Sequence, residues 1–455
     1  MNVIVAGSGK IGKSIVRSML KENHNVTVID VDRQVVSSMT DTFDVLGIVG
    51  NSTSYDVLND AGVKSADLFI AVTSSDEVNM LSCYVAKKMG AKYTVARTRD
   101  FEYNRKSFDF VKDQLGLSMT INPELMTAQF IFNLLKLPSA TNVEMFSRDS
   151  FEVLELNVNK NSPLVGVSLL ELRKKILVDF IVFSVLRNGE VTVPNGSFVL
   201  NEGDKIGIIS QITQSHKLLK LLGFEQKQVK DVVIIGASKI AYYLSSLLIK
   251  SKNPVKIIEK DRQKCEDIST RLQNVPAVIC GDGTSHELLL ENRVTDASAL
   301  VALTNSDEAN ILMSYYANSK GVGKVVTKIN NKELGSISNQ LGVGSQISPK
   351  SIVANVLVRF ARGLENVKGS KIETLYRLLD GKAETVEFLV LDEFKFKDIP
   401  LKNLKFKKNI LIAGIIRDRS CIIPCGEDVI KAGDHVIVAT AGQSLYDLYD
   451  VVLSK

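Results

Sequence analysis

Tryptophan is absent from the 455 residues, and proline, cysteine and histidine are scarce, with 9, 5 and 4 residues. The cysteines form no C-x-x-C pair, and no group of histidines and cysteines has the spacing of a zinc site. We therefore expect reduced thiols and no bound metal. Cys421 and Cys425 flank a turn, and a redox pair there is the alternative to two separate thiols.

Long hydrophobic runs are missing as well. Stretches such as Ala299–Leu303 are far shorter than the roughly 20 residues that span a bilayer. The first residues read as a strand, without the pattern of a signal peptide, so we expect a cytoplasmic protein. The net charge of +5 is dispersed and contains no long basic block, which argues against a nucleic-acid partner.

The chain contains an internal repeat, in which corresponding residues lie about 230 positions apart. An apolar run followed by Gly7-Ser8-Gly9-Lys10-Ile11-Gly12 has its counterpart in Gly236-Ala237-Ser238-Lys239-Ile240-Ala241. The segment Ile70–Asn79 likewise corresponds to Val301–Asn310. The period is too long for a solenoid, so it indicates a duplicated pair of domains.

Each half divides again, because its first part alternates strand and helix patterns and its last part does not. The turn-forming segment Pro138–Thr141 marks the first division, and a softer break lies around Gly363–Gly369. We predict an α/β protein with two Rossmann-like, doubly wound parallel-sheet domains, each followed by a small α+β domain. The predicted bounds are 1–138, 139–227, 228–366 and 367–455.

The first glycine loop is typical of a dinucleotide site. Gly7 permits the tight turn after the strand, Gly9 lets the backbone approach a pyrophosphate, and Gly12 allows close packing of helix on strand. The helix start offers its amides and its dipole to the phosphates. The other loop residues are also candidates for the site: Ser8, Lys10 and Ile11. Lys10 either adds a cation near the phosphates or is simply an exposed residue.

Asp30 ends the second strand at about the spacing expected for an acid that binds ribose. A carboxylate there accepts hydrogen bonds from the 2′- and 3′-hydroxyls and repels a 2′-phosphate. The sequence therefore favours NAD(H) over NADP(H), and we expect Asp32 to contribute to the same rim.

Polar residues after the third and fourth strands extend the predicted site. Asn51 and Ser52 are expected on the adenine side. Thr73 and Ser74 follow the fourth strand, beside the point where ligands bind open α/β sheets. Ser74 and Glu77 also fit the S-x-x-E capping box, so a plain helix cap is the alternative.

Arg97 ends the fifth strand and points toward the same crevice. Its guanidinium either meets a phosphate or forms a structural ion pair with Asp76 or Glu77.

The second copy is eroded. Ser238 replaces the close-approach glycine, Ala241 replaces the packing glycine, and Lys328 stands in place of Arg97. Binding in this half is expected to be weaker or to involve a different ligand. Its candidate residues are Gly236, Ala237, Ser238, Glu259, Asp282 and Thr304.

These motifs together resemble the family of regulators of potassium conductance (RCK, also called KTN). The resemblance rests on Gly7–Gly12, Asp30-Val31-Asp32, Thr73–Asn79 and Arg97, and on Leu164–Leu172, Val182–Gly189 and Leu200–Asp204 of the first small domain. Asn51, where the family usually has aspartate, departs from the pattern, as do Ser238 and Ala241. The tandem arrangement is similar to that of the peripheral subunits of bacterial Trk potassium-uptake systems.

The resemblance implies NAD(H), or ATP/ADP, as ligand, and assembly into a homotetrameric ring. It also implies a membrane potassium transporter subunit of the TrkH or TrkG kind as partner, and thus a peripheral position on the inner face of the cell membrane. In this family the helix after Asn122-Pro123 crosses over to pair adjacent domains, and Ser351–Phe360 is its second-half equivalent. The alternative is a core helix within its own domain.

The small domains contain no charged or nucleophilic cluster suited to catalysis. Dimerisation or ligand sensing is their functional interpretation, and simple packing against the larger domain is the alternative. For the whole chain, a nucleotide-gated regulatory subunit competes with an NAD-dependent oxidoreductase. The second class needs an acid or base near the nicotinamide, and the sequence presents no such group of His, Lys or Tyr.

Overall fold

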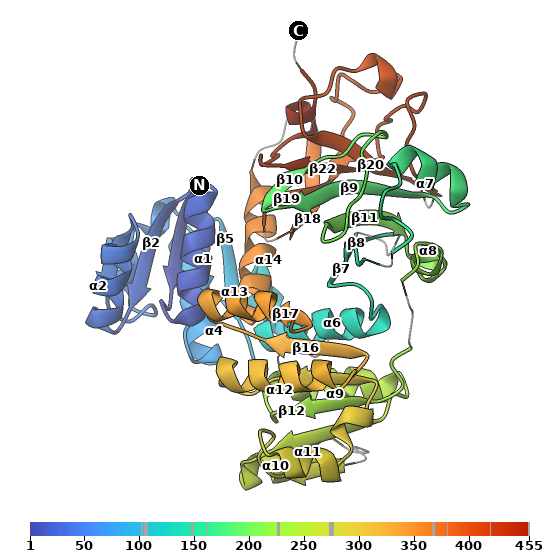
Figure 1. The fold of residues 1–455 in the computed structure, drawn as a ribbon. Helices are drawn as coiled ribbons and strands as arrows, with labels where there is room; N and C mark the ends of the chain where they lie inside the picture. The colour runs from blue at the N-terminus through green and yellow to red at the C-terminus, as the bar shows by residue number, and fades with distance from the viewer. Residues whose placement is uncertain are drawn as a thin grey trace. The chain divides into compact units, whose positions relative to one another are not determined.

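The computed structural model describes residues 1–101, 103, 108–146, 150–160, 162–224, 228–272, 277–365, 369–379, 381–418 and 420–453. The chain forms two compact units, one of residues 1–127 with 348–365 and one of residues 128–347 with 366–455. Each unit therefore draws on both halves of the sequence (Figure 1). Two of the predicted domain boundaries, near residues 227 and 366, lie outside the described residues.

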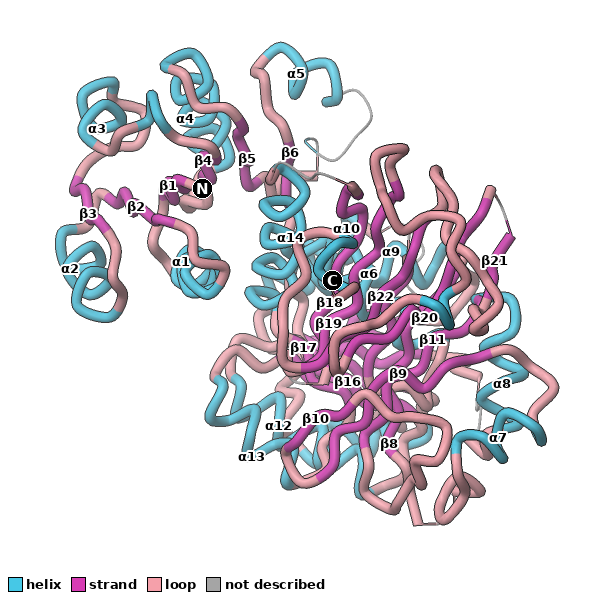
Figure 2. Tube along the Cα trace, turned by 90° about the horizontal axis from the view of Figure 1, so that it is seen from above, coloured by secondary structure: helices cyan, strands magenta, loops and turns pink. Residues whose placement is uncertain are grey.

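The first unit contains a parallel sheet in the order β3-β2-β1-β4-β5-β6. Its strands are β1 (Asn2–Ala6), β2 (Asn25–Asp30), β3 (Leu46–Val49), β4 (Leu68–Ala71), β5 (Tyr93–Arg97) and β6 (Met119–Ile121). The helices are α1 (Lys10–Lys21), α2 (Arg33–Thr42), α3 (Tyr55–Asp60), α4 (Asp76–Met89) and α5 (Phe108–Gln114). Figure 2 shows α1 and α2 on one side of the sheet and α3 and α4 on the other. The apolar central strands are buried on both faces, as the doubly wound prediction requires.

Helix α14 (Pro349–Leu364) completes this unit although it follows the second parallel sheet in the sequence. It packs along α1 and buries Val353, Leu357, Val358 and Ala361 in the core that covers one face of the first sheet. The crossover interpretation is therefore confirmed for the Ser351–Phe360 segment, because its apolar face belongs to the core of a different sheet.

A buried ion pair holds the end of α14 to the end of α1. Arg362 donates from Nη2 to Glu22 Oε1 at 2.9 Å and from Nε to the other carboxylate oxygen. Both side chains are almost completely excluded from solvent. Beside them, burial lowers the pKa of His24, whose ring lies 3.8 Å from the Glu365 carboxylate.

The second unit contains a parallel sheet of the same order, β14-β13-β12-β15-β16-β17. Its strands are β12 (Val232–Ile235), β13 (Val255–Glu259), β14 (Ala277–Cys280), β15 (Ala299–Ala302), β16 (Lys324–Lys328) and β17 (Ser345–Ile347). The helices are α9 (Lys239–Lys250), α10 (Arg262–Arg271), α11 (His286–Glu291), α12 (Asp307–Ser319) and α13 (Lys332–Gln340). The two Rossmann-like domains of the prediction are thus confirmed.

Lys324 is a buried cation of this unit. Its Nζ donates to the carbonyl oxygens of Pro138 and Ala140, at 3.0 and 2.6 Å, and to Ser345 Oγ at 2.9 Å. The two carbonyls follow α6 (Pro123–Lys136), so the lysine fixes the chain where it leaves that helix. Burial lowers the pKa of Lys324 to about 7.

This depressed pKa predicts a stability that rises with pH. Between about pH 7 and the ordinary lysine pKa of 10.5, the unfolded chain binds more protons than the folded chain, so deprotonation favours folding. We expect the free energy of unfolding of this unit to increase with pH, with a slope that approaches about 1.4 kcal/mol per pH unit. Urea titrations at pH 7, 8 and 9 measure it. Lys324→Met should remove the slope and Lys320→Met, at an exposed position, should keep it; equal slopes in all three proteins would contradict the prediction.

The small domains form two five-stranded antiparallel sheets, in the orders β10-β9-β11-β8-β7 and β18-β19-β22-β20-β21. The first contains β7 (Asn142–Met145), β8 (Phe151–Asn157), β9 (Phe180–Arg187), β10 (Glu190–Thr192) and β11 (Lys205–Gln211), with α7 (Leu169–Lys175) and α8 (Ser215–Leu221). The second contains β18 (Ser370–Leu378), β19 (Ala383–Val390), β20 (Ile410–Arg417), β21 (Ser420–Ile422) and β22 (His435–Ala441). Repeated ion pairs, Arg187 with Asp204 and Arg417 with Asp434, mark the duplication.

The two small sheets share one hydrophobic core. Phe151 and Phe183 of the first sheet lie in the same cluster as Leu378, Ile416 and Ile437 of the second. In addition, Glu155 accepts a hydrogen bond of 2.6 Å from the Leu379 amide. The small domains therefore pair with one another within the chain, which supports the dimerisation interpretation over simple packing on a larger domain.

Candidate functional site

The first glycine loop leaves space where a ligand would approach. Gly7 has φ +96°, and a Cβ there would lie 2.7 Å from the Thr73 amide nitrogen, so only glycine fits. A Cβ on Gly12 would lie 1.9 Å from the carbonyl oxygen of Gly7. A Cβ on Gly9 would meet no protein atom within 4 Å. Gly7 and Gly12 are thus fixed by close backbone neighbours, whereas Gly9 leaves open space beside the loop.

The two loops differ at the helix start. Gly9 is the N-cap of α1 and supplies no side-chain hydrogen bond. Within the described part of the chain, no side chain caps the first amides of α1, so these amides can bind an anion. In the second loop, Ser238 Oγ accepts from the Ala241 amide at 3.3 Å and caps α9. The serine therefore occupies one of the donors that a phosphate would use.

Both predicted ribose acids are held at the edge of their sheets in the same way. Asp30 accepts from the Ser8 amide at 2.7 Å and from the Asp32 amide at 3.1 Å. Glu259 accepts from the Ala237 amide at 2.7 Å and from the Asp261 amide at 3.0 Å. The backbone thus orients each carboxylate beside its glycine loop.

Asp32 has a structural task that the sequence interpretation did not assign. Its carboxylate accepts from the Gln34 amide at 2.8 Å and caps α2. The other loop candidates lie where predicted. Ser8 is buried, with its hydroxyl unpartnered; Lys10 is exposed at the start of α1; and the Ile11 side chain packs against the core.

The capping box predicted after the fourth strand is absent. The N-cap of α4 is Ser75, whose Oγ accepts from the Val78 amide at 3.2 Å and donates to Glu77 at 2.7 Å. The prediction that Ser74 caps the helix is therefore wrong: the S-x-x-E pattern selects Ser74, but the helix begins one residue later and its N-cap is a serine without that pattern. Ser74 lies exposed at the sheet edge, and its carbonyl accepts from Arg99 at 2.5 Å.

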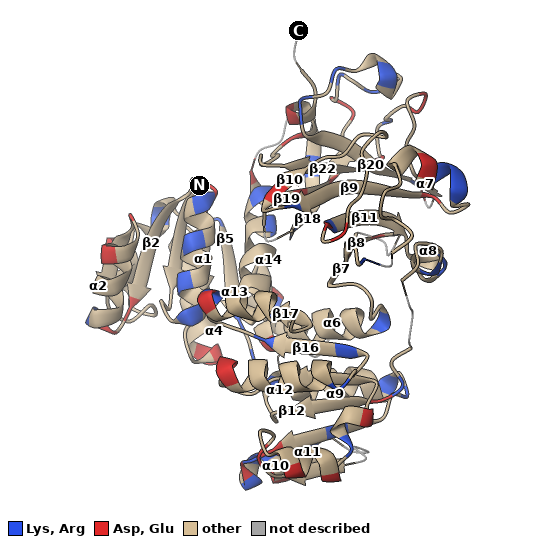
Figure 3. Cartoon of the chain, viewed as in Figure 1, with Lys and Arg blue, Asp and Glu red and all other residues tan. Residues whose placement is uncertain are grey.

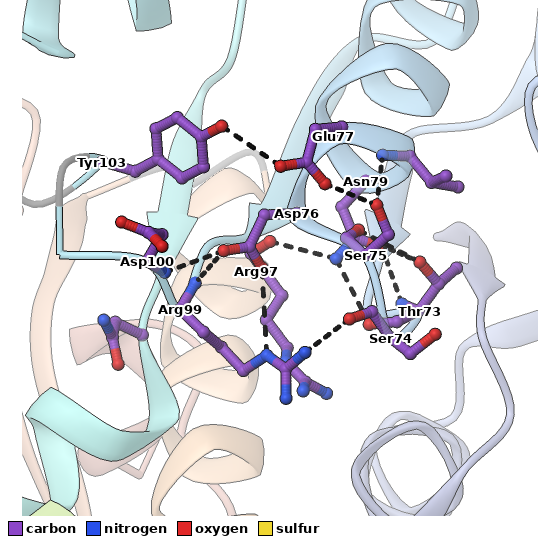
Figure 4. A network of polar contacts seen from close by, with 12 residues as sticks. Thr73, Ser74, Ser75, Asp76, Glu77, Asn79, Arg97, Arg99, Asp100 and Tyr103 are labelled. Atoms are coloured by element: carbon purple, nitrogen blue, oxygen red, sulfur yellow. Dashed lines mark hydrogen bonds and ion pairs between the residues drawn. The ribbon is translucent and has the colours of Figure 1, made fainter. Parts of the chain in front are cut away.

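Asp76 and Asn79 build this edge; the sequence suggested Asp76 only as an ion-pair partner of Arg97 and did not suggest Asn79. Asn79 Oδ1 accepts from the amide and the hydroxyl of Thr73, both at 2.7 Å, and its Nδ2 donates to the Arg97 carbonyl at 3.0 Å. Asp76 accepts from the Arg99 and Asp100 amides at 2.7 and 2.8 Å (Figure 4). Asp307 and Asn310 repeat this arrangement in the second sheet, and that recurrence was the available sequence signal.

Two guanidinium groups lie together at this edge. Arg97 and Arg99 come from the end of β5, and their proximity and burial both lower the pKa of Arg97. Asp76 approaches Arg99 at 3.9 Å, whereas Arg97 Nε is buried without a hydrogen-bond partner. Arg99, not Arg97, is thus the arginine paired with Asp76. In the second sheet Lys328 donates to the Leu303 carbonyl at 3.2 Å, and Asn330 contacts Asp307.

The remaining candidates are already engaged in local contacts. Asn51 accepts from the amide and the hydroxyl of Thr53 at 3.0 Å, and Asp282 binds Thr284 in the same way at 2.9 and 2.8 Å. Ser52 is buried against Ser82, with 2.8 Å between the hydroxyl oxygens. Thr304 binds Asn310 as Thr73 binds Asn79. These loops lie at the carboxyl ends of the parallel strands, but several of their side chains form hydrogen bonds within the loops themselves.

The arrangement defines a class: duplicated α/β domains of the nucleotide-binding type, each paired with a small antiparallel domain. The TrkA-N domain model matches residues 3–123 and 232–349, and the TrkA-C domain model matches residues 153–223 and 385–452. The chain belongs to this TrkA family, and the resemblance drawn from the sequence is confirmed.

Relatives match along nearly the whole chain. The Trk system potassium uptake protein TrkA homolog of Archaeoglobus fulgidus is 33% identical over 439 residues, covering 96% of this chain and 97% of that protein. TrkA of Azorhizobium caulinodans is 27% identical over 445 residues, covering 96% and 95%. Among solved structures, the GsuK RCK domain covers 97% of this chain and 92% of its own, at 18% identity and a TM-score of 0.62. The GsuK channel bound to NAD covers 97% and 76%, at 17% identity and a TM-score of 0.63.

Proposed function

We propose that this chain is a nucleotide-sensing regulatory subunit of a Trk-type potassium-uptake system and that it is not an enzyme. The observation that carries the proposal is the first site, where uncapped amides of α1, the oriented Asp30 carboxylate and two adjacent guanidinium groups face one sheet edge. Amides and guanidinium groups suit a pyrophosphate, and a carboxylate suits ribose hydroxyls. The names of the relatives support potassium uptake as the process.

NAD(H) is the ligand that we propose for the first site, with ATP or ADP as the alternative adenine nucleotide. Ligand binding regulates a partner only if it favours one of two conformations. The paired small domains and the crossover of α14 join the two halves of the chain, and we propose that this connection passes the change to a membrane potassium transporter subunit. The four-module division, 1–138, 139–227, 228–366 and 367–455, remains our working prediction.

The cellular position follows from the proposed partner. No helix in the described part of the chain is both long enough and apolar enough to cross a bilayer. In Figure 3 the positions of Lys and Arg and those of Asp and Glu are interspersed along the ribbon of the described residues. We therefore propose a cytoplasmic subunit attached to the inner face of the membrane through the transporter, and no nucleic-acid partner.

Calorimetry combined with an oxidation assay tests this function. We expect NADH, NAD⁺, ATP or ADP to bind the purified full chain with a saturable heat, and NADH to remain unconsumed when carbonyl substrates are added. The Asp30→Ala variant of the first site is the control for the heat signal. Turnover of NADH would instead favour the NAD-dependent oxidoreductase.

A homotetramer is our proposal for the assembly. Leu81 on α4 and Leu312 on α12 occupy equivalent positions, and both are large apolar side chains exposed on the single chain. We propose that these two leucines belong to the surfaces through which the chains associate. Light scattering of the purified 50.0 kDa chain should give a mass of about four chains. Leu81→Asp with Leu312→Asp should lower that mass, and a monomeric parent protein would contradict the proposal.

A further inference from the structure

Two cysteines lie side by side at the edge of the second parallel sheet. Cys280 is the last residue of β14 and stands opposite Glu259 in the parallel register. Cys265 lies one turn into α10, and its Sγ donates to the Glu259 carbonyl at 3.3 Å. Both cysteines therefore adjoin the same residue, Glu259, one through the strand register and the other through its thiol. Both are free, Cys265 buried and Cys280 exposed.

The first half of the chain provides an internal comparison. Val36 on α2 and Val49 at the end of β3 occupy the equivalent positions, with Val49 opposite Asp30 in the register. The fold therefore brings these two positions together whatever residues they carry. Val36 is buried and Val49 is 42% exposed, just as Cys265 is buried and Cys280 exposed, so the two halves share the geometry at these positions and differ in their chemistry. The second half has a cysteine at both contact positions.

We propose that Cys265 and Cys280 form a redox pair, which a hydroperoxide closes to a disulfide that joins α10 to β14 beside Glu259. Exposed Cys280 attacks the terminal peroxide oxygen, which breaks the O–O bond, gives a sulfenic acid and releases water or an alcohol. The Cys265 sulfur then attacks the sulfenic sulfur, loses its proton and displaces water. Two thiols are oxidised and one peroxide is reduced, so electrons and atoms balance.

The surroundings fix the order of the two steps. Burial, followed by the contact with Cys280, raises the pKa of the Cys265 thiol to about 11. Cys265 is thus a poor first nucleophile in solution, and its proposed role is to resolve the sulfenic acid that forms at Cys280. The other cysteines lack this arrangement: Cys83 is buried against the Val95 carbonyl, and Cys421 donates to the Ser150 carbonyl at 3.6 Å.

The consequence concerns the half with the eroded glycine loop. The disulfide would close a loop of about 15 residues and restrain α10, whose N-cap Asp261 lies next to the predicted ribose acid. If the nucleotide function proposed above is correct, the second half senses oxidants while the first senses nucleotides. The redox step itself does not depend on that function.

Mass spectrometry after treatment of the reduced full-length protein with hydrogen peroxide tests the pair. We expect the loss of two free thiols per chain, a peptide that joins residues 265 and 280, and reversal by dithiothreitol. Cys280→Val and Cys265→Val each place the first half's residue at the contact and should abolish the linked peptide. Cys421→Val is the matched control that should retain it.

Two results would overturn the inference: Cys280 oxidised to sulfinic acid without linkage, or a disulfide that joins different chains. Thermal melting of oxidised and reduced protein gives a second measurement, and we expect oxidation to raise the melting temperature by several degrees in the parent but not in the valine variants. Nucleotide calorimetry on the oxidised protein separates the two proposals. A linked peptide without any nucleotide binding would leave the redox pair standing and refute the nucleotide function.

Discussion

Replacing Glu22 by glutamine is expected to lower the free energy of unfolding of the first unit by about 3–5 kcal/mol, because it removes the carboxylate charge that pairs with the buried Arg362 guanidinium. The side chain keeps its size, so a cavity does not contribute. Few exposed substitutions approach this effect. The exposed Arg262–Glu266 pair is the matched control, and Arg262→Met should change stability by less than about 0.5 kcal/mol.

Hydrogen exchange measures this loss locally, which suits a chain of several domains that has no tryptophan. Amides of α1 and α14 should exchange faster by roughly two to three orders of magnitude in the Glu22→Gln variant. The double variant Glu22→Leu with Arg362→Met removes both charges and should regain most of the protection. If the single and double variants lose equal protection, the pair contributes by shape and not by charge.

Replacing Asp30 by alanine is expected to weaken nucleotide binding at the first site by about 100-fold. The proposed carboxylate accepts two hydroxyl hydrogen bonds, and bonds to a charged group contribute about 1.5–3 kcal/mol each. Two such bonds, lost with partial replacement by water, correspond to roughly 3 kcal/mol. The backbone amides of Ser8 and Asp32 also lose their acceptor, which loosens the loop further.

Calorimetry on Asp30→Ala and Glu259→Ala compares the two halves. The Glu259 variant should retain the strong binding event, because Ser238 already occupies a helix amide in the second loop. Asp30→Asn provides the conservative control: it keeps an acceptor oxygen and should lose less affinity for NADH, while the removed charge improves the relative binding of NADPH. Equal losses in the Asp30 and Glu259 variants would refute the asymmetry between the copies.

The sequence was sufficient for features that depend on local pattern. Apolar runs followed by glycine loops located β1 and β12, and the spacing to Asp30 and Glu259 located the second strands. It failed where contacts depend on distant residues. Asn79 and Asp76 act on residues 97–100, and a helical pattern alone does not reveal such a target.

Strand register and backbone conformation determine the other features that the sequence did not predict. Ser74 fits the S-x-x-E motif, yet Ser75 caps the helix, because the backbone at the start of α4 places the first turn one residue later. The pairing of Cys265 with Cys280 requires the strand register of β13 and β14, which no spacing rule for cysteines contains. The Cys421–Cys425 alternative came from sequence proximity, but Cys421 turns its thiol to the Ser150 carbonyl.

The position of α14 has a consequence for the history of the gene. A gene cut between the halves would encode an N-terminal product whose first sheet lacks the helix that covers one face, with apolar residues such as Ile15 and Met19 left unshielded. Such a fragment should fold only when the other product is supplied in trans. Duplication followed by fusion is therefore hard to reverse: because the first sheet relies on a helix from the second half of the chain, fission leaves the first product incomplete.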